Sequence, residues 1–195
     1  MSPSEEIQFV QSLKARDDRA FEQLIAKFKT PIFNLLYRMT GVREEAEDLA
    51  QEVFVTVYKK IGLFRGESPL ATWIYRIAYN LCMNRRKYLG RRRDRERQTF
   101  DEVAERNIVE SGTMSTSAQI SRPDEMAEGH QMERLIQDAI TALDEEQRVI
   151  LVLRDVQNVS YEDISEITGL PAGTVKSRLH RARMALKERL APYLR

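Results

Sequence analysis

The sequence predicts an all-α protein made of two small helical domains joined by a flexible linker, with a helix-turn-helix in the second domain. Glycine and proline are sparse, at 8 and 6 of 195 residues, so few positions break a helix. Apolar residues recur at spacings of three and four, and no segment alternates as a strand does. A polar stretch divides this pattern once, and the 42% apolar content allows each part its own core.

The first domain is expected to span residues 1–97 and to contain four helices. Apolar stripes mark the third and fourth helices, and stripes of this kind pack against one another in a compact bundle. The helices are expected near residues 4–16, 18–40, 43–62 and 70–90, with stripes formed by Ala46, Ala50, Val53, Val57 and Ile61 and by Ile74, Ile77, Ala78 and Leu81.

Residues 98–126 are expected to form the flexible linker. Small and polar residues dominate it, and it lacks a sustained apolar face. Its 2 basic and 6 acidic residues give it a net charge of −4. Such a segment buries too little apolar surface to offset the entropy lost on ordering.

The second domain is expected to span residues 127–195. Ser160 and Asp163 resemble a capping box, with Asp in place of the usual Glu or Gln, so a short helix should begin at 161 and end at Gly169. Pro171 then presets the start of another helix. That second helix turns its apolar residues inward, and the pair forms a helix-turn-helix; the inward residues are Val175, Leu179, Ala182 and Leu186.

Charge is distributed unevenly, although the net charge is only +1. Residues 1–93 carry 17 basic and 11 acidic residues, whereas residues 172–195 carry 7 basic and 1 acidic. The positive charge is concentrated on the last helix and on the arginine-rich stretch 85–97. This pattern is expected of two separate surfaces that face polyanions.

The outer face of the last helix is small, polar and basic near its start. A major groove admits such a face, with the outer cations left for phosphates. A plain helical hairpin with a solvated basic face is the alternative, but the capped helix, the turn and the segregated cations together favour nucleic acid. The candidate residues are Thr174, Lys176, Ser177, Arg178, His180, Arg181 and Arg183.

A second polar face lies on the fourth helix, preceded by an aromatic and basic loop. Amides pair with base edges and aromatics stack on unpaired bases, which suits single-stranded nucleic acid. The alternative is that Phe64 and Trp73 are ordinary core residues and Asn80 a surface residue. The candidate residues are Phe64, Arg65, Arg76, Tyr79, Asn80, Asn84 and Lys87.

The third helix carries acidic and apolar residues side by side in EEAEDLAQEVF (44–54). Asp48, Gln51 and Glu52 are expected on an exposed flank, with Leu49, Val53 and Phe54 alongside. By itself such a flank is more often a solvated acidic face than a docking surface.

The composition argues against several classes of protein. The single cysteine, Cys82, and two histidines without ligand spacing argue against a disulfide framework, a metal site or a bound cofactor. The sequence lacks a Gly-rich phosphate loop and a nucleophile with a nearby base, so we expect neither an enzyme nor a small-molecule substrate. The lack of a secretion signal or of an apolar run long enough to span a bilayer predicts a cytoplasmic protein without membrane insertion.

Taken in order, these segments resemble the extracytoplasmic function sigma factors of bacterial RNA polymerase, the sigma-E-like group. Residues 48–54 resemble the core-polymerase docking motif, residues 64–80 the promoter-melting and −10 segment, and residues 160–183 the −35 reader. The resemblance implies a transcription initiation factor that binds core RNA polymerase and promoter DNA, reads −35 as duplex, melts −10, and is held inactive by an anti-sigma factor. A stand-alone helix-turn-helix regulator is the alternative, although neither an effector domain nor a dimer interface is evident.

Overall fold

A computed structural model of the protein describes residues 3–104 and 125–193. The described residues form eight α-helices and no strand, which confirms the all-α prediction. The N-terminal group of helices is α1 (Pro3–Lys14), α2 (Asp18–Thr40), α3 (Arg43–Lys60) and α4 (Leu70–Ala104), with the 3-10 turn η1 (Ile61–Leu63) after α3. The C-terminal group is α5 (Glu125–Thr141), α6 (Glu145–Leu151), α7 (Tyr161–Thr168) and α8 (Ala172–Leu190).

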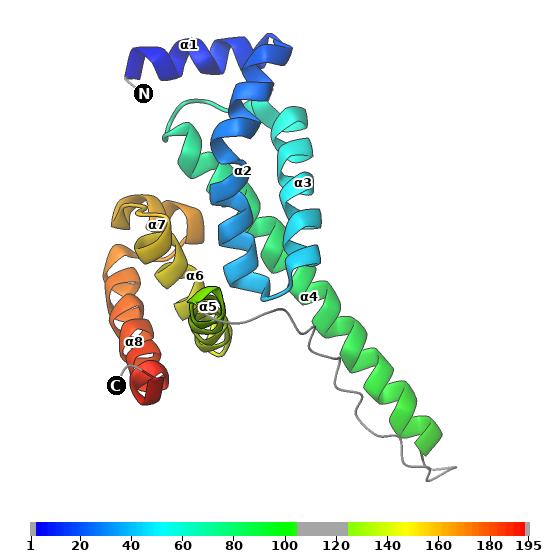
Figure 1. The fold of residues 1–195 in the computed structure, drawn as a ribbon. Coiled ribbons are helices and arrows are strands. Elements are labelled where there is room, and N and C mark those ends of the chain that lie inside the picture. The colour runs from blue at the N-terminus through cyan, green and yellow to red at the C-terminus, as the bar shows by residue number, and fades with distance from the viewer. Residues whose placement is uncertain (1–2, 105–124, 194–195) are drawn as a thin grey trace.

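The N-terminal domain is a bundle in which α3 and α4 pack against α2 (Figure 1). The stripes predicted for α3 and α4 are confirmed in their main members, because Ala46, Val53, Ile74 and Ala78 are fully buried. Since side chains three and four positions apart share one helix face, each stripe closes over its neighbour. The facing stripe of α2 consists of Leu24, Phe28, Ile32, Leu35 and Met39.

The fourth helix is longer than the predicted 70–90, and it continues past the ends of α2 and α3 (Figure 1). Residues 98–104, predicted as the start of the linker, belong to this helix in the structure. The extension contains neither Pro nor Gly after Gly90, and arginine and glutamate are good helix formers. The rest of the predicted linker up to residue 124 lies outside the described residues.

The C-terminal domain is a second helical unit with the predicted helix-turn-helix. The Ser160 hydroxyl accepts a hydrogen bond from the Asp163 backbone N–H at 3.0 Å, which caps the start of α7. Gly169 ends α7 in the left-handed conformation, at φ 73°, and Pro171 precedes α8. The predicted inward residues of α8 are confirmed: Val175, Leu179 and Ala182 are buried, and Leu186 packs on the core.

The two domains pack against each other, and their cores form one continuous apolar cluster. Arg148 of α6 lies at the junction and is only 5% exposed. Its guanidinium donates to the carbonyls of Ile140, Thr141 and Leu143 in its own domain and to Met39 O of α2 at 2.7 Å. Carbonyls at helix ends have no partner within the helix, so this buried cation caps α5 and α2 together.

Within the described ranges, no helix combines the length and the apolar run that crossing a bilayer requires.

Candidate functional site

The exposed face of α8 is the one predicted from the sequence. Lys176, Ser177, His180 and Arg181 are exposed along it, and Thr174 is half-buried. The core contacts of α8 lie on the opposite side, so the polar face is presented by a helix that is anchored along its length. This arrangement leaves the first half of α8 free to enter a groove.

Two arginines of the predicted set are engaged with acidic residues of their own domain. Arg178 pairs with Glu146 of α6. Arg183 makes two hydrogen bonds to the Asp155 carboxylate, at 2.9 and 2.6 Å, and these bonds raise its pKa. Both pairs brace α8 against its neighbours in this structure, and both leave a cation near the rim of the exposed face.

Tyr161, at the start of α7, is a residue that sequence reasoning missed at this surface. Its ring lies under two cations, 5.6 Å from Lys176 Nζ and 4.9 Å from the Arg154 guanidinium carbon. Cations over an aromatic face are attracted by the ring quadrupole. The ring therefore helps to hold positive charge at the junction of α7 and α8.

The predicted residues of α4 lie along one side of the helix and differ in their exposure. Asn80, Asn84 and Lys87 are exposed, whereas Arg76 and Tyr79 are half-buried. Two amides and one cation are thus exposed on one helix, a combination that can contact bases and backbone of a nucleic-acid strand.

The loop before α4, residues 64–69, presents one of its two predicted residues. Arg65 is exposed, but Phe64 is only 4% exposed and packs against Trp73, with 5.3 Å between the ring centroids. The structure thus agrees with the alternative that this aromatic pair belongs to the core. Contact between Phe64 and a base would require the loop to open.

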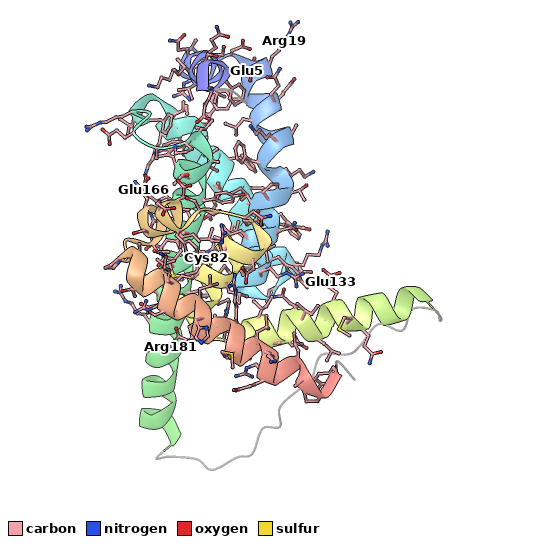
Figure 2. The ribbon with its side chains drawn as sticks, turned by 90° about the vertical axis from the view of Figure 1, so that its left-hand side faces the viewer. Glu5, Arg19, Cys82, Glu133, Glu166 and Arg181 are labelled. Carbon is pink, nitrogen blue, oxygen red and sulfur yellow. The ribbon has the colours of Figure 1, made fainter. Side chains whose placement is uncertain are left out.

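The C-terminal domain covers the N-terminal half of the α4 face. Arg76 pairs with Glu166 of α7, the acidic residue labelled beside α4 in Figure 2. The buried Thr72 hydroxyl donates to Asp163 Oδ1 at 2.8 Å, and Tyr75 Oη donates to Gln157 Oε1 at 3.0 Å. Two carboxylates of the helix-turn-helix, those of Asp163 and Glu166, therefore engage side chains on this part of α4.

Tyr79 lies at the edge of the same contact. Burial is the main cause that raises the pKa of its phenol, and the charges of Glu145 and Glu146 from α6 add to the effect. Tyr79 therefore remains a neutral hydroxyl, able to donate or accept a hydrogen bond at neutral pH.

The predicted docking residues of α3 divide into an exposed group and a buried group. Asp48, Gln51 and Glu52 are exposed, and Glu52 pairs with Arg85 of α4 at 2.8 Å. Leu49 and Val53 are both 0% exposed and hold α3 in the core. Phe54 is half-buried.

An apolar groove of about 730 Å³ lies between α2 and α3 beside these residues. Sequence reasoning missed most of it, although Val55 follows the predicted motif directly and is half exposed. The sequence did contain a signal for this groove, because Ile25 and Val55 are apolar residues that fall outside the buried stripes of their helices. The groove is lined by Ile25, Lys29, Thr30, Phe33, Arg43, Glu47, Ala50, Gln51, Phe54 and Val55.

The described residues contain no group of three or more His, Cys, Asp and Glu side chains that could hold a metal ion. Cys82 is buried in the N-terminal core, and burial raises the pKa of its thiol to about 11. Because a thiol reacts as the thiolate, Cys82 is inert at neutral pH.

Comparison with known proteins places two family regions on the two domains. The family model for Sigma-70 region 2 matches residues 24–93, and the model for Sigma-70 region 4 matches residues 133–186. The first match covers most of α2, all of α3 and most of α4, and the second covers part of α5, all of α6 and α7, and most of α8. Neither includes α1.

Curated relatives match over nearly the whole chain. The RNA polymerase sigma-H factor of Pseudomonas aeruginosa is 35% identical over 195 residues, which are 100% of this chain and 98% of the relative. The ECF RNA polymerase sigma-E factor of Haemophilus influenzae is 35% identical over 185 residues, or 95% of each chain. The corresponding Escherichia coli factor is 30% identical over 186 residues, or 95% of this chain and 94% of the relative.

Two solved structures share the fold. The sigma factor RpoE of Bartonella quintana, crystallised with the anti-sigma factor NepR, has a TM-score of 0.61 and 26% identity, covering 88% of this chain and 96% of that one. CnrH in complex with the cytosolic domain of CnrY has a TM-score of 0.68 and 18% identity, covering 96% and 97%. The second likeness concerns the fold alone.

Proposed function

The chain belongs to the extracytoplasmic function sigma factors of the sigma-70 family, which direct bacterial RNA polymerase to promoters, and we propose that its three polar surfaces divide this work. The exposed face of α8 reads −35 DNA, the α4 face captures −10 DNA, and the α3 flank docks on core polymerase. The observation that supports this division best is that the basic face of α8 lies within the region 4 match, at residues 133–186. The chain contributes no catalytic chemistry of its own and acts in the cytoplasm.

At −35, Ser177 and Arg181 contact base edges, while Lys176, Arg178 and Arg183 chiefly hold phosphates. Arg181 and Ser177 are exposed on the face away from the core contacts, where a duplex would lie. Arg178 and Arg183 must exchange their carboxylates for phosphates. Because each exchange gives up one ion pair for another, Lys176 should contribute more to the affinity than either arginine.

At −10, Asn80 recognises an unpaired base, supported by Arg65, Asn84 and Lys87. An amide reads the Watson–Crick edge only after the base has left its pair, so this contact couples recognition to melting. All four side chains are exposed and need no rearrangement of the bundle.

The closed arrangement of the two domains is the form we assign to the free protein. Arg76 and Thr72 are engaged by Glu166 and Asp163 of α7, so the N-terminal half of the α4 face is closed to DNA. Promoter binding then requires α7 to leave α4. By analogy with the Bartonella quintana complex, a partner of the anti-sigma type would hold the chain inactive.

The core-docking assignment is tested by the double substitution Asp48→Arg and Glu52→Arg. Both side chains are exposed, so reversal should leave the fold intact while it opposes a basic partner surface and weakens core binding by about tenfold or more. The matched control reverses Glu162 and Glu188, which are exposed in the other domain and change the net charge equally. The affinity for core polymerase, measured with labelled protein, should fall for the Asp48 and Glu52 substitutions alone. Equal affinity for both double variants would mean that the α3 flank is only a solvated acidic face.

A pull-down with core polymerase also separates the two non-catalytic readings. A sigma factor is retained by core polymerase without DNA, whereas a stand-alone regulator binds DNA and is not retained.

A further inference from the structure

The loop before α4 is anchored at both ends and exposed between them. Its first residue, Phe64, is held against Trp73, and Leu70, which follows the loop, is buried in the core. Between them, Arg65 and Glu67 form an ion pair at 3.8 Å with both side chains exposed. An exposed pair of this kind contributes little. The position of the loop therefore depends on what holds its ends.

The residue just before α4 has no side chain that could cap the helix. This residue, Pro69, can accept only through its backbone carbonyl, which takes a hydrogen bond from Trp73 N at 3.2 Å. The Leu70 N–H instead donates to Glu6 Oε1 of α1 at 2.6 Å. A carboxylate at the positive end of a helix forms a charge-assisted bond that a neutral cap does not match. Glu6 therefore caps α4 from 64 residues away.

Glu6 is held in place independently of this loop. Leu13 of α1 is fully buried in the N-terminal core. Arg16, just after α1, adopts a positive φ of 65°, and its guanidinium lies 4.3 Å from the centre of the Tyr58 ring while donating to Tyr58 O. The C-terminal end of α1 is thus anchored on the N-terminal domain, and α1 contacts α2 and η1, so Glu6 is carried by a helix that packs on the bundle without the loop.

A hollow of about 600 Å³ separates α1 from the loop. Ile7, Val10 and Lys14 line it on α1, and Arg65 and Ser68 line it on the loop. Since the loop does not pack closely on α1 here, it has room to shift if the Glu6 contact is lost.

We propose that Glu6 is a positioning residue for −10 recognition. Its carboxylate fixes the start of α4, and with it the loop that presents Arg65, in the geometry that captures unpaired bases. This inference rests on the proposed function of the α4 face, but it concerns a helix outside the region 2 match, which begins at residue 24.

The test compares Glu6→Ala and Glu6→Gln with the control Gln8→Ala, which alters an exposed side chain of the same helix. Promoters are first selected with the wild-type protein and core polymerase from a library randomised at −35 and −10. Permanganate reactivity of −10 thymines, base preference at both elements, core affinity and thermal unfolding are then measured for each variant.

Glu6→Ala should reduce open complex on duplex promoters by about tenfold, which corresponds to about 1.4 kcal/mol. It should relax base preference at −10 only, with wild-type core affinity and −35 preference. A pre-melted −10 bubble should restore opening without restoring the −10 preference. Glu6→Gln keeps an acceptor oxygen without the charge and should fall between Ala and wild type, and Gln8→Ala should match wild type.

Wild-type opening and −10 preference in Glu6→Ala would overturn the inference. So would a proportional loss of core affinity, −35 preference and thermal stability, because that pattern marks a purely structural role. Failure of the wild-type protein to open any promoter with core polymerase is a distinct outcome: it would overturn the proposed function and this inference with it.

Discussion

Replacing Glu166 with lysine should open the contact between the two domains. Glu166 of α7 pairs with Arg76 of α4, and the two side chains are 36% and 38% exposed. The substitution removes this attraction and places two cations opposite each other. The helix-turn-helix should keep its fold, because Glu166 is an exposed residue outside the buried face of α7.

The expected magnitude follows from the exposure of the pair. A partly exposed ion pair is worth about 0–1 kcal/mol, and the repulsion that replaces it is of similar size, so the closed form should lose up to about 2 kcal/mol. This shifts the closed–open equilibrium by up to about 30-fold toward the open form. The shift should shrink as salt rises toward 1 M, where charges are screened within about 3 Å.

Energy transfer between dyes on the two domains measures the opening. Cysteines introduced at Gln23 of α2 and Glu188 of α8, both exposed, provide the attachment sites. The native Cys82 does not compete for label, since burial raises its pKa to about 11. Lower transfer efficiency at low salt, recovering at high salt, is the expected result for Glu166→Lys.

Glu162→Lys is the matched control. Glu162 lies on the same helix, is exposed, and undergoes the same change of charge. If both variants lowered transfer efficiency equally, or if Glu166→Lys left it unchanged at low salt, the Arg76 pair would have no part in holding the domains together.

Three further predictions concern single residues. Arg181→Ala should relax specificity at one −35 position by about 1–3 kcal/mol in a binding assay with variant duplexes, whereas Lys176→Ala should weaken binding to all sequences alike and lower the salt slope by about one. Unaltered −35 preference in Arg181→Ala would show that the helix is oriented differently. Asn80→Ala should bind core polymerase and closed promoter normally but yield less open complex, and a pre-melted bubble should restore transcription without restoring −10 preference; full opening on duplex DNA with unchanged preference would make Asn80 an ordinary surface residue. Folding raises the pKa of Cys82 from 9.0 to about 11, so its contribution to stability is complete below pH 9 and is lost as pH rises to 11, by about 3 kcal/mol. Denaturant unfolding should show a shallower decline between pH 9 and 11 in Cys82→Ala, and an identical decline would mean that the thiol does not titrate as assigned.

Helix phase and capping were predictable because they depend on neighbours close in sequence. Ser160, Gly169 and Pro171 mark the ends of α7 and the start of α8 by rules that need no tertiary contact, and the structure confirms them. Pro31 lies within α2 without ending it, since Phe28 and Ile32 continue the buried stripe on both sides.

Contacts between distant segments were not predictable from local pattern. In the sequence, Arg148 resembles an ordinary surface cation. In the structure it lies between the ends of α2 and α5, because helix-end carbonyls from both domains converge there. Arg178 and Arg183 read as free cations, and only the fold brings Glu146 and Asp155 against them. The end of α4 was misplaced because good helix formers carry a helix beyond the last residue that packs on the core.

The assignment of the chain's surfaces is tested most directly by permanganate footprinting of a selected duplex promoter with the chain alone, core polymerase alone, and both together. Reactive −10 thymines should appear only with both. They should disappear when the −35 element is scrambled, and they should be reduced when Asn80→Ala replaces the wild type. Melting that is independent of −35, or reactivity with the chain alone, would contradict the assignment of α8 to −35 reading and of α4 to −10 capture.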